Sequence, residues 1–246
     1  MNIKFLKFQN PPPTSESGYT ILEGIMAILM VTVMLTLVGP VIAFSVGTRV
    51  QAKRIELASQ AAKTYVDSLR AGSLPPPVDN NLTDTTALKL RPAPNSGQAD
   101  GGDLDCDDKS GFCENNNAAS NTLYCVSFDG NNTCSNESLV DMIVQAQACY
   151  PSPGGETPDV AKDKGYHLLV RVYRANAFGK LTDGFKTNQN GKTVDSSVTN
   201  ALGNPALPLT TFTTYIVPTS DNAFKSFQAS AISQKDNNCL KEDPSP

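Results

Sequence analysis

The side chains in this sequence that could do chemistry are concentrated in one acidic segment that also carries two cysteines. Residues 100–114 read DGGDLDCDDKSGFCE and hold six acidic residues against one lysine. Calcium-binding loops of the EF-hand type take carboxylate ligands at positions one, five and twelve, and commonly at three. Four residues stand at those positions: Asp103, Asp105, Asp107 and Glu114. The spacing makes them a candidate metal site and makes calcium the candidate cofactor.

Two features of the same segment argue against calcium binding. Asp108 stands where an EF-hand loop needs glycine, and no helical pattern flanks the segment. The alternative is a solvated acidic loop pinned by Cys106 and Cys113. A carboxylate pair in such a loop is also poorly placed for catalysis, because catalytic groups need a rigid support. A membrane-anchored hydrolase is therefore the weaker function class, and we predict that the protein is not an enzyme.

The cysteines predict an oxidising compartment. Their number is even, and five of the six lie within residues 106–149, a pattern that suits disulfides better than cytosolic chemistry. Six cysteines allow 15 pairings, and the sequence does not choose among them. No C-x-x-C is present, so the spacing does not support a structural zinc site. The disulfide candidates are Cys106, Cys113, Cys125, Cys134, Cys149 and Cys239.

The single histidine, His167, excludes any metal site that needs two imidazoles and is the one residue available for a Ser-His or Cys-His pair. It lies beside Arg171 and Tyr173 in an alternating apolar segment, so the plainer interpretation is a polar outer face of a sheet. The net charge is −4 and the pI about 5.0, and the chain has no basic–aromatic patch. We therefore expect no nucleic-acid partner.

The elements that carry these side chains begin with an apolar segment near the N-terminus. Residues 24–48 carry no charge. As a helix they would be about 37 Å long, enough to cross a bilayer core of about 30 Å with some tilt. A cleavable signal sequence is disfavoured because the run is long and follows acids at Glu16 and Glu23. A plain anchor leaves Glu23 without a partner, since the next cation is Arg49, more than six turns away.

Residues 17–23, SGYTILE, resemble the processing site of type IV prepilins and type II secretion pseudopilins. In that family a dedicated peptidase cuts after the glycine, methylates the new N-terminus and leaves a glutamate as the fifth mature residue. The resemblance implies a leader at 1–18, cleavage after Gly18 and a methylated Tyr19. It also implies that Glu23 neutralises a neighbouring subunit's N-terminus in the filament core. Pro40 stands where pilin helices commonly have a helix breaker, and a proline there should kink or locally melt the helix.

The resemblance extends over residues 17–77, about a quarter of the chain. Over these residues the chain resembles a pseudopilin group of a cyanobacterial polysaccharide secretion system used in gliding motility. The implied partners are other pseudopilins or pilins, the prepilin peptidase, the inner-membrane assembly platform with its ATPase, and membrane lipid. The implied location is the inner membrane, crossed once, with the C-terminal domain in the periplasm before filament assembly or surface exposure. The alternatives are a type II secretion pseudopilin for protein export, and a membrane-anchored calcium- or ligand-binding tip adhesin.

The helix is predicted to continue beyond the membrane. An apolar stripe follows at spacings of three and four: Ile55, Ala58, Ala62, Tyr65 and Leu69. Gly72 suits the position after a helix end, and Pro75 to Pro77 forbid continuation. We therefore predict one helix over 19–72, with its membrane segment at about 21–47.

Residues 73–246 are predicted to form a soluble, loop-rich β domain. The clearest strand is 166–174, YHLLVRVYR, whose side chains alternate between two faces. Weaker candidates are 122–128, 139–149, 210–217 and 225–232. Strands joined by long polar loops fit an antiparallel sheet packed on the helix, which is an α+β fold of the type IV pilin-like kind.

Overall fold

The computed structural model describes residues 20–77, 93–94, 104–114, 122–131, 133–149, 165–181, 184–187 and 204–217, together with Lys225 and Gln228. The chain divides into two compact units, one ending at Val46 and the other beginning at Gly47. Helix α1 (Ile21–Arg70) extends over residues of both units. The predicted leader 1–18 and the predicted site residues Tyr19, Asp103 and Cys239 lie outside the described residues.

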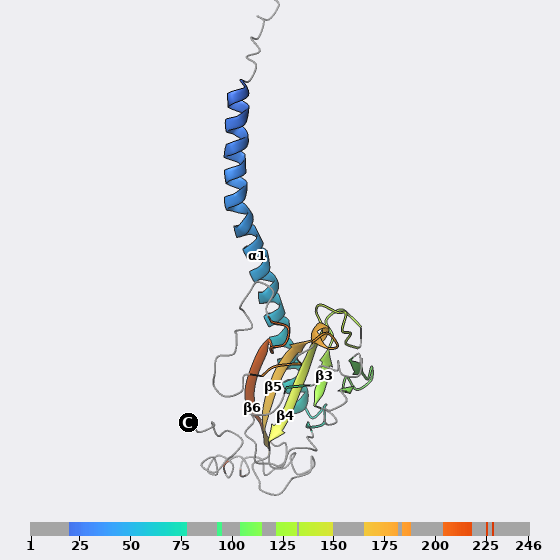
Figure 1. The fold of residues 1–246 in the computed structure, drawn as a ribbon. Helices are drawn as coiled ribbons and strands as arrows, with labels where there is room; N and C mark the ends of the chain where they lie inside the picture. Colours follow the sequence, from blue (N-terminus) through green and yellow to red (C-terminus); the bar gives the residue numbers. More distant parts are fainter. Residues whose placement is uncertain are drawn as a thin grey trace, which may run out of the picture. The chain divides into compact units, whose positions relative to one another are not determined.

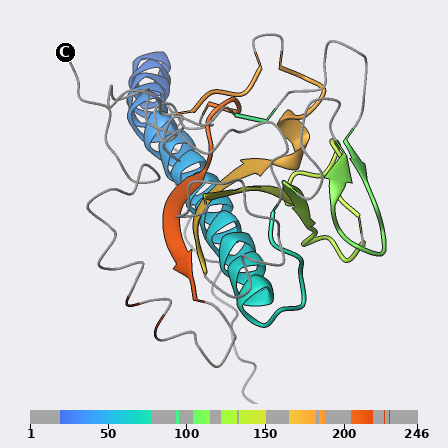
Figure 2. The ribbon, with the colours of Figure 1, turned by 90° about the horizontal axis from the view of Figure 1, so that it is seen from below.

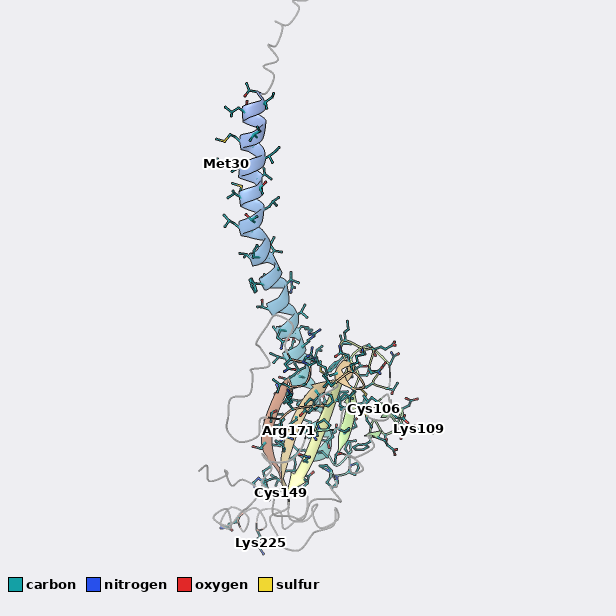
Figure 3. The ribbon with its side chains drawn as sticks, viewed as in Figure 1. Met30, Cys106, Lys109, Cys149, Arg171 and Lys225 are labelled. Atoms are coloured by element: carbon teal, nitrogen blue, oxygen red, sulfur yellow. A yellow bond between two sulfur atoms is a disulfide. The ribbon has the colours of Figure 1, made fainter. Side chains whose placement is uncertain are left out.

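The first half of α1 is an apolar helix with exposed side chains. Its N-terminus is capped by Thr20, whose Oγ1 accepts a hydrogen bond from the Glu23 N–H at 3.3 Å. Every residue from Thr20 to Val46 is exposed, and Met30 projects away from the helix (Figure 3). This helix is long and apolar enough to cross a membrane. It continues through Pro40, so the predicted alternative of local melting is wrong: the single lost backbone bond does not end the helix.

The second half of α1 buries one face. Ala58, Ala62, Tyr65 and Leu69 of the predicted stripe are buried, but Ile55 is only half-buried. The buried face is wider than the predicted stripe, because a helix lying on a sheet contacts it over a broad arc. The further buried residues are Gln51, Leu57, Ala61 and Val66.

The end of α1 is fixed by its own backbone. Gly72 has a φ of 70°, in the left-handed region that glycine adopts without strain. The N–H of Ser73 bonds to the carbonyl of Ser68 at 2.9 Å, and the N–H of Gly72 bonds to the carbonyl of Leu69 at 3.1 Å. These two bonds form a Schellman motif, so the predicted role of Gly72 after the helix end is confirmed.

The described part of the second unit contains a four-stranded antiparallel sheet in which each strand pairs with the next along the chain (Figure 1). The strands are β3 (Leu123–Val126), β4 (Met142–Cys149), β5 (Tyr166–Arg174) and β6 (Thr210–Ile216). The prediction for 166–174 is confirmed, and three weaker candidates contain β3, β4 and β6. The fold is α+β with a pilin-like architecture, as predicted.

The fifth strand candidate, 225–232, is wrong where it is described. Only Lys225 and Gln228 of that range are described, and both are helical. Lysine and glutamine favour helix over strand, and this segment lacks the β-branched alternation that marks β5. The rest of the candidate lies outside the described residues.

The two central strands, β4 and β5, are buried on both faces. One face packs on the second half of α1 (Figure 2), through Val144, Val170 and Val172 among others. On the other face His167, Leu169, Arg171 and Tyr173 are also buried, so the predicted polar outer face is wrong. Period-two alternation separates the two faces of a strand but does not say which of them meets water. A second apolar cluster, which includes Ile143, Tyr173, Phe178 and Phe185, occupies part of this face.

Candidate functional site

The acidic segment forms a short disulfide-closed hairpin. Strands β1 (Asp105–Cys106) and β2 (Cys113–Glu114) pair antiparallel, with Asp105 opposite Glu114. Cys106 and Cys113 also lie opposite each other and form a disulfide. The predicted closure of this acidic loop by these two cysteines is therefore confirmed. Lys109 lies in the hairpin turn and is exposed (Figure 3), whereas Cys106 is buried.

Asp107 organises the turn between these strands. One of its carboxylate oxygens accepts the Lys109 N–H at 3.0 Å, and the other accepts the Ser110 hydroxyl at 2.8 Å. These donors stabilise the ionised carboxylate and lower the pKa of Asp107. Both oxygens therefore already have partners, as in an Asx turn, and a cation would have to share them.

The calcium prediction falls on a set of residues that the structure describes only in part. Asp105, Asp107 and Glu114 are described, and Asp103 is not. Among the residues with described positions, no three His, Cys, Asp or Glu side chains are grouped closely enough to hold a metal ion. The hairpin pairing explains this, because Asp105 and Glu114 are opposite each other while Asp107 turns toward its own loop. Calcium binding by the complete segment stays a prediction.

The hairpin docks on the edge of the sheet through Gly111. Its carbonyl accepts the Cys125 N–H at 2.8 Å, and the next residue, Phe112, bridges to Tyr124. The Tyr124 ring lies between the Phe112 ring, 5.4 Å away, and the Tyr65 ring of α1, 5.3 Å away. The acidic hairpin is therefore joined to the helix through three aromatic side chains.

Gly111→Ala is expected to lower the free energy of unfolding by about 2–5 kcal/mol, as a strained φ of roughly 1–2 kcal/mol adds to overpacking of roughly 1–3 kcal/mol. Gly111 has a φ of 72°, and an added Cβ would lie 2.9 Å from Cε2 of Tyr124. The control is Gly130→Ala, where φ is 87° and no atom lies within 4 Å, so only the strain applies. Thermal unfolding of the two variants compares them. Equal losses would contradict the contact with Tyr124.

The second disulfide and one buried acid hold the loop that follows β3. Cys125 and Cys134 are bonded, and Asp141, only 1% exposed, accepts backbone N–H bonds from Phe128 at 3.1 Å and Ser135 at 3.4 Å. No local pattern in the sequence marks Asp141, because its partners lie 13 and 6 residues away. Its role is to close a loop, since both oxygens serve backbone donors.

No protein-family model, curated protein or solved structure matches this chain. Function must therefore be argued from the residues and their arrangement.

Glu23 and Pro40, the predicted assembly residues, both lie on the first half of α1. Glu23 is the third residue of the helix after the Thr20 cap, the Thr-x-x-Glu arrangement of a capping box. The Gly24 N–H also bonds to the Thr20 carbonyl at 3.2 Å. A carboxylate in the first turn is favoured by the helix dipole, so Glu23 stabilises the helix start in addition to its predicted assembly role.

The buried face of the sheet carries the remaining predicted groups. His167 contacts the Tyr215 ring edge to face at 5.1 Å, and burial lowers its pKa, so the neutral imidazole is favoured. His167 is paired in register with Cys149, which is disulfide-bonded. No free cysteine occurs among the described residues. A neutral histidine packed between a disulfide and a tyrosine fits a core position.

Proposed function

We propose that this chain is a pseudopilin or minor pilin, a subunit of a type IV pilus-like or type II secretion-like filament. The observation that carries the proposal is one helix with two kinds of surface. Residues 21–46 of α1 are apolar and exposed, whereas the later half of the same helix is buried against an antiparallel sheet. An exposed apolar helix half needs an apolar environment, which a bilayer supplies first and a filament core afterwards.

The proposed processing and assembly of the subunit follow from residues 17–23, SGYTILE. The chain enters the inner membrane with its leader in the cytoplasm and its β domain in the periplasm. The prepilin peptidase cuts after Gly18 and methylates Tyr19, and the assembly platform with its ATPase lifts the subunit into the filament. The disulfides Cys106–Cys113 and Cys125–Cys134 suit an oxidising periplasm. The similarity over 17–77 further favours a filament for polysaccharide secretion and gliding motility over one for protein export.

The capping box supports this assignment in a second way. The Thr20 cap and Glu23 place the start of α1 two residues after Tyr19, the proposed mature N-terminus. The positive terminus of a processed chain would then lie within one helical turn of the Glu23 carboxylate of its own or an adjacent subunit. In a low-dielectric core such a pair is favourable, and it would set the axial register between neighbouring helices.

The experiment that tests the proposal is peptide mass spectrometry of the N-terminus of the protein recovered from membranes. We expect a chain that begins at methylated Tyr19. A chain that begins at Met1 would indicate a plain anchor, and one that begins near Val46 would indicate a cleaved signal sequence. Gly18→Val, which places a branched side chain at the cleavage site, is the control and should leave the leader attached.

A further inference from the structure

Cys149, the last residue of β4, is a buried cysteine whose disulfide partner lies outside the described residues (Figure 3). It is 1% exposed and disulfide-bonded. The other four described cysteines are bonded to one another. The sequence holds six cysteines, and the one that remains is Cys239. Of the pairings that the sequence allows, elimination therefore leaves a single one for Cys149 within the chain.

Cys149 lies on the face of the sheet that points away from α1. His167 is opposite it in register, and Leu169 forms a small apolar cluster with it. These three residues, the Cys149 patch, are between 1% and 8% exposed. No other buried apolar residue of the described ranges joins the patch, because the second apolar cluster lies around Ile143 and Tyr173 at the other end of these strands. Side chains on one face of a sheet point the same way and do not cover each other from above, so a further segment of the chain covers the patch.

The disulfide of Cys149 identifies this segment. A disulfide holds its two Cα atoms about 4–7 Å apart, so the residues next to Cys239 must lie beside Cys149. We propose that the C-terminal segment, residues 229–246, covers the Cys149 patch and is held there by a Cys149–Cys239 disulfide. The segment contains two large apolar residues, Ile232 and Leu240, whose burial on an apolar patch is favourable.

A cysteine of a second copy is the competing partner of Cys149. Because Cys149 is 1% exposed, its sulfur reaches another molecule only after its cover is removed, so a bond within the chain is favoured. Residues 150–164, which follow β4 directly, are the competing cover. The C-terminal segment is favoured over them because the bond itself brings Cys239 to the patch.

Formation of this bond requires an oxidant. Each thiol loses one hydrogen, and the two electrons and two protons reduce the disulfide of a thiol oxidoreductase to its dithiol. The two cysteines are 90 residues apart, whereas those of the other two disulfides are 7 and 9 residues apart. A bond that closes a longer loop restricts the unfolded chain more, so this disulfide should contribute the most to stability.

The pairing is tested by peptide mapping of the purified full-length protein without reduction, after free thiols are blocked with N-ethylmaleimide. Cleavage after glutamate leaves Cys149 as the only cysteine of residues 138–156, and trypsin leaves Cys239 alone in residues 236–241. We expect these two peptides to have one combined mass that a reductant separates. A peptide 138–156 linked to itself would assign the bond to a second copy, and blocked thiols at both positions would overturn the proposal.

His167 tests the cover, because it is the only histidine of the chain. The rate at which diethyl pyrocarbonate modifies its imidazole measures access to the Cys149 patch. We expect Cys239→Ala to react severalfold faster than the parent protein and to have a Tm about 10–15 °C lower. The control removes the hairpin disulfide with Cys106→Ala and Cys113→Ala, and it should keep the slow rate of the parent.

An unchanged rate of histidine modification in Cys239→Ala would overturn the proposed cover and assign it to another segment, such as residues 150–164. An equal increase in the control variant would show that His167 responds to any loss of stability, which would also contradict the proposal. If Cys239→Ala fails to fold, the peptide map of the parent protein still decides the pairing. Neither measurement involves filaments, so failure of this proposal and failure of the proposed function are distinguishable.

Discussion

Glu23→Ala is expected to abolish incorporation of the subunit into filaments, and Glu23→Gln should abolish it as well. The two substitutions separate the two roles of this residue. Glutamine at the third helical position still completes a capping box with Thr20, whereas only glutamate can neutralise a neighbouring N-terminus. Moving the unpaired terminal charge into a low-dielectric core would cost several kcal/mol, enough to prevent assembly. Incorporation is measured by immunoblotting of filaments sheared from cells and pelleted.

The matched control for Glu23 is Thr20→Ala. It removes the cap at the cost of about 1 kcal/mol of helix stability but leaves the carboxylate in place, so filaments should still contain the subunit. N-terminal mass spectrometry of each variant shows whether processing has occurred, which separates a cleavage defect from an assembly defect. Normal incorporation of Glu23→Gln would mean that Glu23 serves only as part of the helix cap.

Tyr65→Ala is expected to lower the free energy of unfolding of the β domain by about 3–5 kcal/mol, the range for truncating a large aromatic residue in a core. Tyr65 is fully buried and lies in the core cluster formed by α1 and the sheet. Its ring also contacts Tyr124, which in turn contacts Phe112 at the hairpin. We therefore expect the loss to affect both the helix–sheet packing and the docking of the acidic hairpin.

Near-UV circular dichroism during thermal unfolding of the full chain in detergent measures this effect, since the protein has seven tyrosines and no tryptophan. A loss of 3–5 kcal/mol corresponds to a fall in Tm of about 6–20 °C for a protein of this size. Tyr65→Phe keeps the ring and should unfold close to the parent, and Lys63→Ala, at an exposed position two residues earlier, should have little effect. A loss below about 1 kcal/mol for Tyr65→Ala would place this ring outside the core.

The helix was the most predictable element because its signals are local. The uncharged run, the three-and-four spacing and Gly72 followed by prolines each act within a few residues, and α1 ends with the Schellman motif that Gly72 allows. Strand β5 was predictable for a similar reason, since its nine consecutive residues alternate between the two faces of the strand. Candidate 225–232 was wrong at its two described residues, and it holds no β-branched residue before Ile232.

The candidate site was less predictable, because its contacts join distant segments. The carboxylates of the acidic hairpin matched a calcium spacing, yet the carboxylate of Asp107 serves its own turn. The disulfide partners could not be chosen among 15 pairings until the chain positions were known. Asp141 had no local signal at all, since it accepts bonds from two loop residues that only the tertiary fold brings to it.

The amino-acid sequence by itself determined the apolar helix, the glycine that follows its C-terminal end, the alternating strand and the processing-like segment, because each depends on neighbours along the chain. The tertiary structure decided which faces are buried, since burial depends on every segment that packs against a residue. His167 and Arg171 were expected on a solvated face and lie in the interior. Arg174 is buried as well, because strand register pairs it with Met142 of the core between the sheet and α1.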